Sequence, residues 1–263
     1  MKTNNHLLRR LTAALLAAVL ALSIALPVFA SDDSDTIYIN SVSDLLSLAK
    51  SCAYDQWSVG KTVILQKDLS LEGMLWEPIP SFSGQFKGNG HTISDLTITG
   101  QYSPAGLFGI VEEQGSIESL SVRGVVSVSD SADTTTGGIV GVNHGTLINC
   151  QFTGVVTGDS EVGGIVGRNE SEGTIDHSTA RAIVTGKSST GGIAGYNLGA
   201  ITGCTNVGSI NTEYPEASLD TDGFTAKMVD YINNKMAAAD DDVTNSVTNV
   251  ATDTGGIAGR SSG

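Results

Sequence analysis

Four copies of one glycine-rich phrase constrain the fold of this chain more than any other feature. The copies are GGIVG at 137–141 and 163–167 and GGIAG at 191–195 and 255–259, and AGLFG at 105–109 is a degenerate fifth. The first three copies start 26 and 28 residues apart. Self-similarity at such a period is typical of a solenoid, in which each repeat stacks on the one before it.

The match extends past the glycines into segments that begin at Thr146, Thr174 and Ala200, and the segments 116–122 and 92–98 fit the same template. In each segment, apolar residues alternate over a few positions and are punctuated by glycine or asparagine. Such alternation favours short strands, because β-branched runs disfavour helix and glycine supplies the positive φ that a corner needs. Coils of this length predict an all-β fold, a right-handed parallel β-helix with rungs about 4.8 Å apart.

The alignment assigns residues to columns that run from coil to coil inside the solenoid. The first interior column is expected to contain Ile93, Ile117, Leu147, Ile175 and Ile201, and the second Leu96, Leu120, Cys150, Ser178 and Cys204. One coil cannot bury these side chains alone, so stability is expected to come from contacts between neighbouring coils.

Residues outside the regular coils divide the rest of the chain. Leu45, Leu48, Ala49 and Cys52 recur at helical spacing, which predicts an N-terminal helix over 41–52 that caps the first coil. The β-helix is expected over 61–212 after an N-terminal segment, 31–60. A helical insertion is expected over 213–250, because the apolar residues of 222–239 fall on one helix face. Residues 251–263 are the start of a further repeat, which predicts a longer parent polypeptide.

Residues 1–30 have the pattern of a secretory signal peptide. Basic residues precede an apolar run from Leu11 to Leu26, and Val28 and Ala30 suit cleavage before Ser31. An uncleaved membrane anchor is the alternative, since the run is near the length that spans a bilayer. The leader predicts a secreted or cell-surface protein.

The chain is acidic, which restricts its partners. It has 14 basic and 28 acidic residues, and three of the basic residues lie in the leader. This excess repels nucleic acid and anionic lipid surfaces, so neither is expected as a partner. A solvated surface shell explains the same composition.

Three cysteines in an exported chain raise the question of a disulfide. Cys150 and Cys204 fall in one expected column two coils apart, about 9.6 Å, whereas a bridge needs Cα atoms within about 7 Å. With Cys52 buried by the expected helix, all three are predicted to be free, buried thiols.

The repeats resemble those of a family of secreted bacterial proteins that carry the GLUG motif, a short Gly-[Gly/Leu]-[Ile/Val]-x-Gly unit. Segments 76–80 and 82–93 resemble the family's first coil, so the likeness covers roughly 40–210 and resumes at 255. The resemblance implies a pectin-lyase-like right-handed β-helix, and such repeats are also found beside IgA-specific metallopeptidases. It implies little about activity, because fold and function separate readily.

No catalytic, cofactor or metal site is predicted. Asp95, Glu118 and Asp176 are scattered outward carboxylates, and Arg123 and Arg181 lie two coils apart, whereas polysaccharide cleavage needs a cluster. Aspartates at 220–222 and 240–242 offer oxygen ligands for calcium without the spacing of a known loop, and a solvated linker or helix cap explains them. The histidines after the leader lack zinc-ligand spacing, and no nucleotide loop follows the glycines.

Three functions follow from these observations. The first is a non-catalytic β-helical module, a structural stalk or an adhesin-like binder of an extracellular glycan or protein. The second is a polysaccharide lyase or hydrolase of pectin-lyase-like fold. The third is an accessory segment of a larger secreted peptidase. Non-enzymatic binding is the prediction, and the ligand is not encoded in a recognisable motif.

Overall fold

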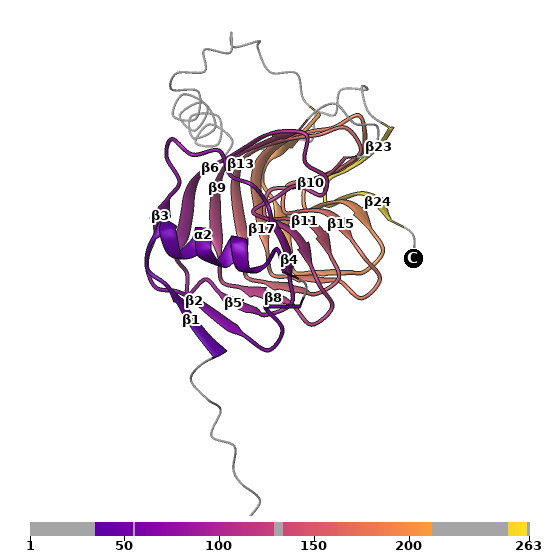
Figure 1. Ribbon diagram of the computed structural model, residues 1–263. Helices are drawn as coiled ribbons and strands as arrows, with labels where there is room; N and C mark the ends of the chain where they lie inside the picture. The colour runs from indigo at the N-terminus through magenta and orange to yellow at the C-terminus, as the bar shows by residue number, and fades with distance from the viewer. Residues whose placement is uncertain (1–34, 55, 129–133, 212–251, 262–263) are drawn as a thin grey trace, which may run out of the picture. The chain divides into compact units, whose positions relative to one another are not determined.

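The computed structural model describes residues 35–54, 56–128, 134–211 and 252–261. They form a parallel β-solenoid of about 6 turns with a single helix (Figure 1), as the sequence predicts. The expected insertion at 213–250 lies outside the described residues. Among the described residues, no helix is long and apolar enough to span a bilayer.

Four parallel sheets, here called A to D, run along the stack. Sheet A contains β1 (Thr36–Ile39), β2 (Thr62–Leu65), β5 (Gln85–Lys87), β8 (Ser116–Glu118), β12 (Thr146–Ile148), β16 (Thr174–Asp176) and β20 (Ala200–Thr202). Sheet B contains β3 (Leu69–Ser70), β6 (Thr92–Gly100), β9 (Ser121–Val128), β13 (Gln151–Thr157), β17 (Thr179–Thr185), β21 (Thr205–Asn206) and β22 (Ser209–Ile210).

The other two sheets contain the glycine-rich phrases. Sheet C contains β4 (Ile79–Phe82), β7 (Phe108–Val111), β11 (Val140–Asn143), β15 (Val166–Asn169), β19 (Ala194–Asn197) and β24 (Ala258–Ser261). Sheet D contains β10 (Thr135–Gly137), β14 (Glu161–Gly163), β18 (Ser188–Gly191) and β23 (Thr252–Gly255). A complete coil therefore visits sheets C, A, B and D in that order.

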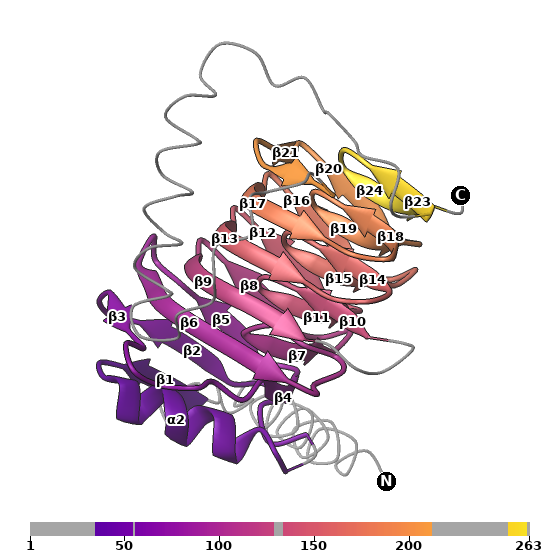
Figure 2. The same ribbon diagram turned by 90° about the horizontal axis from the view of Figure 1, so that it is seen from above.

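Helix α2 (Val42–Ser51) matches the predicted helix almost residue for residue. Ser41 is its N-cap, with a side chain that accepts a hydrogen bond from the Asp44 backbone N–H, and Cys52 is its C-cap. Leu45 and Leu48 are buried. The helix lies at the N-terminal end of the stack, beside β1 and β4 (Figure 2). It covers an end that would otherwise expose strand edges.

The stack begins earlier than the sequence predicts. Strand β1, before the helix, pairs in register with β2, so that Thr36 lies beside Thr62. The expected boundary at residue 61 therefore separates two strands of one sheet. The short apolar run of β1 has no counterpart in the glycine repeats, which is why the repeat period does not reveal it.

The two expected interior columns are correct in four coils and wrong in the fifth. Leu147 pairs with Ile117 and Ile175, and Ile201 continues the column. In the second column, Leu120 O, Cys150 O and Ser178 O each accept a hydrogen bond from the next coil. The donors are the backbone N–H groups of Gln151, Thr179 and Thr205, which follow Cys150, Ser178 and Cys204. The register predicted for the last four coils is therefore confirmed.

Ile93 and Leu96 lie outside their expected columns. Ile93 pairs with Val122 in sheet B, and Phe86 takes the place beside Ile117. A register shift between Ile93 and Leu96 then brings Leu96 opposite Gly124. The error arises because the segments 92–98 and 116–122 have the same spacing of apolar residues, which many inward-facing strands share.

The motif glycines have a different role from the one predicted. The repeated phrase does not place them at positive φ; the left-handed corner positions are instead Ser119, Asn149, His177 and Gly203, with φ between 46° and 61°. A Cβ on Gly138 would overlap the Phe152 ring, and one on Gly164 would overlap the carbonyl oxygen of Gly192. The phrase needs glycine because neighbouring coils approach too closely for any side chain.

A buried asparagine ladder connects three coils at the end of sheet C. Asn143 Nδ2 donates to Asn169 Oδ1 at 2.7 Å, and Asn169 Nδ2 donates to Asn197 Oδ1 at 2.8 Å. Each amide also donates to a nearby glycine carbonyl oxygen. The ladder satisfies polar groups that would otherwise be buried without partners at this corner.

Candidate binding surface on sheets C and D

The outer face of sheet C presents one column of side chains to the solvent. In register order the column contains Ser81, Ile110, Val142, Arg168, Tyr196 and Arg260. Its character changes along the stack: Ile110 and Val142 are apolar, whereas the later members are cationic or aromatic. The adjacent strands of sheet D pack against sheet C, because small glycines at 141, 167 and 195 leave no side chain between them.

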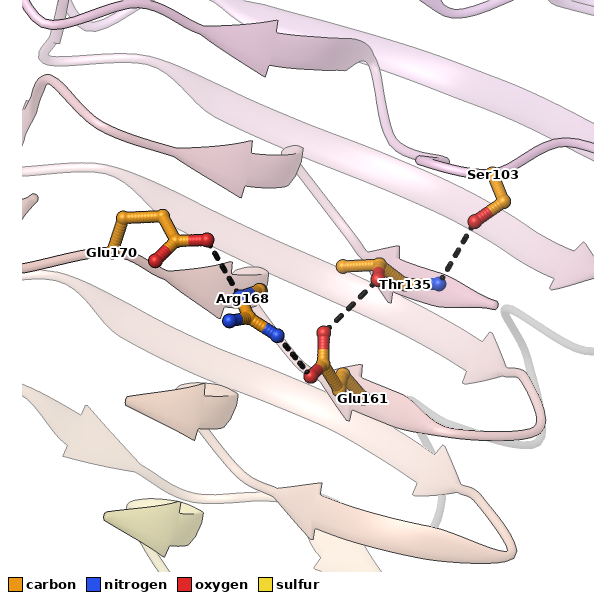
Figure 3. Close-up of polar contacts among 5 residues, drawn as sticks. All are labelled: Ser103, Thr135, Glu161, Arg168 and Glu170. Carbon is orange, nitrogen blue, oxygen red and sulfur yellow. Dashed lines mark hydrogen bonds and ion pairs between the residues drawn. The ribbon is translucent and has the colours of Figure 1, made fainter. Parts of the chain in front are cut away.

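Arg168 is the centre of a polar network on this surface (Figure 3). Its guanidinium contacts Glu161 Oε1 through Nη1 at 2.7 Å and Glu170 Oε1 through Nε at 2.6 Å. Thr135 Oγ1 donates to Glu161 Oε2 at 3.0 Å, and the Thr135 backbone N–H donates to Ser103 Oγ at 3.2 Å. The network thus joins three coils, through residues on or beside sheets C and D.

The electrostatics of the network keep Arg168 charged. Partial burial lowers the pKa of its guanidinium, but the hydrogen bonds and charges of Glu170 and Glu161 outweigh burial, so the pKa lies above its ordinary value. Both carboxylates are themselves about four-fifths buried. Charge-assisted hydrogen bonds in such a setting hold the side chains in one geometry.

Tyr196 lies between two cations on the same column. The Arg168 guanidinium carbon lies 4.8 Å from the ring centroid, and that of Arg260 lies 5.8 Å from it. Both distances fit a cation–π contact. We call the side chains of Glu161, Arg168, Glu170, Tyr196 and Arg260 the C/D cluster. A fixed aromatic ring with hydrogen-bonding groups beside it is suited to recognising a polar ligand.

The carboxylates singled out from the sequence are placed apart, as expected for Glu118 and Asp176. These two share an outward column of sheet A, with Ile148 between them. Asp95 belongs instead to the shifted segment of sheet B, where it accepts hydrogen bonds from Ser70 and Ser94. Sequence reasoning missed that Lys87 neighbours Glu118 in sheet A, because the misplaced Ile93 segment took that position.

The two arginines singled out from the sequence lie on one outward column of sheet B. Arg123 and Arg181 are separated there by Thr153, which confirms a spacing of two coils.

The histidines are placed at corners. His91 Nδ1 lies 3.1 Å from Asp68 Oδ1, and His177 Nδ1 lies 2.8 Å from Asp176 Oδ1. A hydrogen bond from the Thr92 backbone, followed by that of His91, lowers the pKa of Asp68. In the described part of the chain, no group of three or more histidine, cysteine or acidic side chains is placed to hold a metal ion. The aspartates at 220–222 and 240–242 lie outside that part.

All three cysteines are free thiols in the structure. Cys52 and Cys150 are buried as predicted, whereas Cys204 is only partly buried. Desolvation raises the pKa of Cys150 to about 12 and that of Cys52 to about 11. The burial expected for Cys204 is wrong in degree, because its coil is the last in sheet A among the described residues.

The C/D cluster was not found from the sequence, although a signal exists. In register, Glu161 replaces Thr135, and Arg168 replaces Val142 of the preceding coil and faces Tyr196 of the next. Comparing the repeats column by column at outward positions would show that charged residues first enter these columns of sheets C and D in this coil. The inward columns do not contain these residues.

Comparison with known proteins agrees with this architecture. The family model for the GLUG motif matches residues 158–185, the coil that carries Glu161 and Arg168. The chain is 32% identical to halomucin of Haloquadratum walsbyi over 155 residues, which cover 54% of this chain and 2% of that protein. Residues 158–185 thus match the GLUG motif, and the described residues form a parallel β-helix.

Two further proteins are similar. A candidate Gly-rich membrane protein of Evansella cellulosilytica is 29% identical over 137 residues, which cover 38% of this chain and 16% of that protein. A crystal structure of a candidate immunoglobulin A1 protease from Bacteroides ovatus superposes with a TM-score of 0.55 at 20% identity, over 68% of this chain and 60% of the other. The latter likeness shows the fold alone. This chain thus spans a small part of the curated relatives it matches.

Proposed function

We propose that this chain is a non-catalytic β-helical module outside the cell, either a structural stalk or an adhesin-like binder of a glycan or protein. The names of two relatives, halomucin and a candidate Gly-rich membrane protein, support a surface location. The leader-like pattern of residues 1–30 supports export. Stacked coils in one register supply a rigid rod whose outer columns repeat at about 4.8 Å.

The observation that carries the binding role is the C/D cluster. Its ring and hydrogen-bonding groups are fixed by mutual contacts, so a ligand would not need to order them on binding. Tyrosine supplies contact area together with a hydroxyl, which suits the face of a sugar ring or a polar protein surface. The net charge of −14 opposes polyanionic ligands.

Binding is tested with the purified protein on glycan and extracellular-protein arrays, followed by titration of each hit. Tyr196→Ala is expected to weaken binding by about tenfold, since one aromatic contact contributes on the order of 1 kcal/mol. Tyr38→Ala is the matched control, because Tyr38 is a 51% exposed tyrosine on sheet A, away from the cluster. Equal loss in both variants would contradict a role for the C/D cluster.

Absence of catalysis is part of the same proposal and has its own assay. Pectate, pectin and other uronate polymers are incubated with the protein, with and without calcium, and no unsaturated products or new reducing ends are expected. Cleavage of a glycosidic bond needs a positioned pair of carboxyl groups, and Glu118 and Asp176 are separated by a coil. Turnover that disappears on substitution of one surface Asp or Glu would overturn the proposal.

A further inference from the structure

The hydrogen-bonding groups of the C/D cluster are only partly used within the protein. A guanidinium has five N–H donors, and two of those on Arg168 are occupied, by Glu161 and Glu170. Figure 3 shows the guanidinium between the two glutamates, with its third nitrogen on neither dashed line. The Arg168 side chain is 34% exposed, so its other N–H groups can donate to a ligand.

Hydrogen-bond acceptors lie beside these donors. Both oxygens of Glu161 are occupied, by Arg168 and by Thr135. Oε1 of Glu170 accepts from Arg168, whereas its Oε2 has no hydrogen-bond partner in the described ranges. The Tyr196 hydroxyl has no partner there either, and it can both donate and accept. The C/D cluster therefore offers donors and acceptors side by side.

The charges of the C/D cluster balance. Its two cations are Arg168 and Arg260, and its two anions are Glu161 and Glu170. A ligand that carries a carboxylate or sulfate would meet the glutamates on a chain of net charge −14, and a ligand that carries an ammonium group would meet the arginines. Like charges brought together at a binding site oppose association. An uncharged ligand avoids both penalties.

Sugar hydroxyls match this combination of groups. A hydroxyl both donates and accepts, so two adjacent hydroxyls can donate to Glu170 Oε2 while they accept from Arg168. A carboxylate only accepts and an ammonium group only donates, so neither can use both residues. The contacts that hold Arg168 between the glutamates also fix these groups before a ligand arrives, which lowers the entropic cost of binding.

A protein surface matches the C/D cluster less well. Four of the five side chains in the cluster are charged, whereas the buried centre of a protein–protein interface is depleted of charged residues. A small ligand requires only a few polar groups that fix its orientation. Building on the binding role proposed above, we propose that the C/D cluster binds an uncharged saccharide through adjacent hydroxyl groups, which accept from Arg168 and donate to Glu170.

The test compares uncharged and acidic saccharides on the full-length protein. An array presents uncharged glycans, each beside its uronate or sulfated form, together with extracellular proteins. Each pair that gives a signal is then titrated by calorimetry at one ionic strength. The uncharged form is expected to bind about tenfold more tightly than its acidic form, because the acidic group meets Glu170 without a matching donor.

Glu170→Gln separates the charge of the cluster from the charge of the protein. It keeps the size of the side chain and an acceptor oxygen but leaves the cluster with a net positive charge, so the preference for the uncharged form should fall to about threefold or less. Glu118→Gln is the matched control, because it changes the net charge equally on sheet A and should retain the tenfold preference. Circular dichroism verifies the fold of each variant.

Arg168→Lys is a second variant that keeps the charge and removes the planar guanidinium. It is expected to weaken binding of the uncharged saccharide about tenfold. Tighter or equal binding of the acidic form, a preference that Glu170→Gln leaves unchanged, or binding of protein alone would overturn this inference and leave the binding role intact. Absence of binding to every glycan and protein would overturn the binding role itself, and this inference with it.

Discussion

At the scale of single residues, the repeat is dictated by how closely the coils approach. A glycine can be required for its backbone dihedrals or for its missing side chain, and the structure separates the two cases. Gly164 lies against Gly192 of the next coil, whereas Gly73 sits in a turn at φ 74° with open space around it. The GGIVG phrase is therefore a packing motif between neighbours, which explains why it recurs at the period of the coil.

This distinction predicts unequal costs for two glycine substitutions. Gly164→Ala should destabilise the protein by about 3 kcal/mol or more, because the new methyl group would overlap the backbone of the adjacent coil. Gly73→Ala should cost only about 1 kcal/mol, the penalty of a left-handed conformation. Urea denaturation measures both free energies of unfolding. Similar costs for the two variants would mean that the motif glycines are required for their backbone dihedrals and not for the absence of a side chain.

The Cys150 thiol predicts how stability depends on pH. Its pKa is raised by desolvation from 9.0 to about 12, so the folded state keeps its proton where the unfolded state loses it. The contribution of Cys150 is therefore constant below about pH 9 and declines as the pH rises toward 12. At pH 10 the loss relative to pH 8 is about 1.4 kcal/mol for this one group.

Cys150→Ala isolates that contribution. The drop in the free energy of unfolding between pH 8 and pH 10 should be smaller in the variant than in the unaltered protein by about 1.4 kcal/mol. Other groups that titrate in this range are common to both proteins and cancel in the comparison. An identical drop would show that the thiol is hydrated in the native state.

At the scale of helices and strands, an element could be predicted from the sequence wherever one local pattern was unambiguous. Helix α2 could be predicted because Ser41 provides an N-cap and four residues recur at helical spacing. The last four coils could be aligned because the glycine phrase fixes the register of each coil against the next. Strand β1 and the register of β6 could not, since neither carries the phrase and a bulge at Asp95 shifts the pairing.

The candidate site was beyond sequence reasoning for a different reason. Glu161 and Arg168 belong to neighbouring strands of one coil, and only the tight packing of sheet D on sheet C brings their charged groups to 2.7 Å. Spacing along the chain does not encode that approach. The asparagine ladder had a visible signal, because Asn143, Asn169 and Asn197 each follow the glycine phrase at the same distance.

At the scale of the whole molecule, the described chain is a stack in which each coil is stabilised chiefly by its neighbours. Apolar columns, the asparagine ladder and the C/D cluster all run along the stack and connect successive coils. Such an architecture suits a rigid support for a binding surface.

The central claim is that the coils stack in the register seen in the structure, and a pair of engineered disulfides tests it most directly. In a background of Cys52→Ala, Cys150→Ala and Cys204→Ser, one variant carries Gln85→Cys with Ser116→Cys. A second carries Thr92→Cys with Ser116→Cys. Gln85 and Ser116 are register partners, about 4.8 Å apart, whereas Thr92 pairs with Ser121 in a different sheet.

After mild oxidation, non-reducing mass spectrometry of peptides reports which pair has closed. The structure predicts a disulfide in the Gln85→Cys, Ser116→Cys variant and free thiols in the Thr92→Cys, Ser116→Cys variant. A disulfide in the second variant and free thiols in the first would contradict the observed register and restore the alignment in which Ile93 stacks on Ile117.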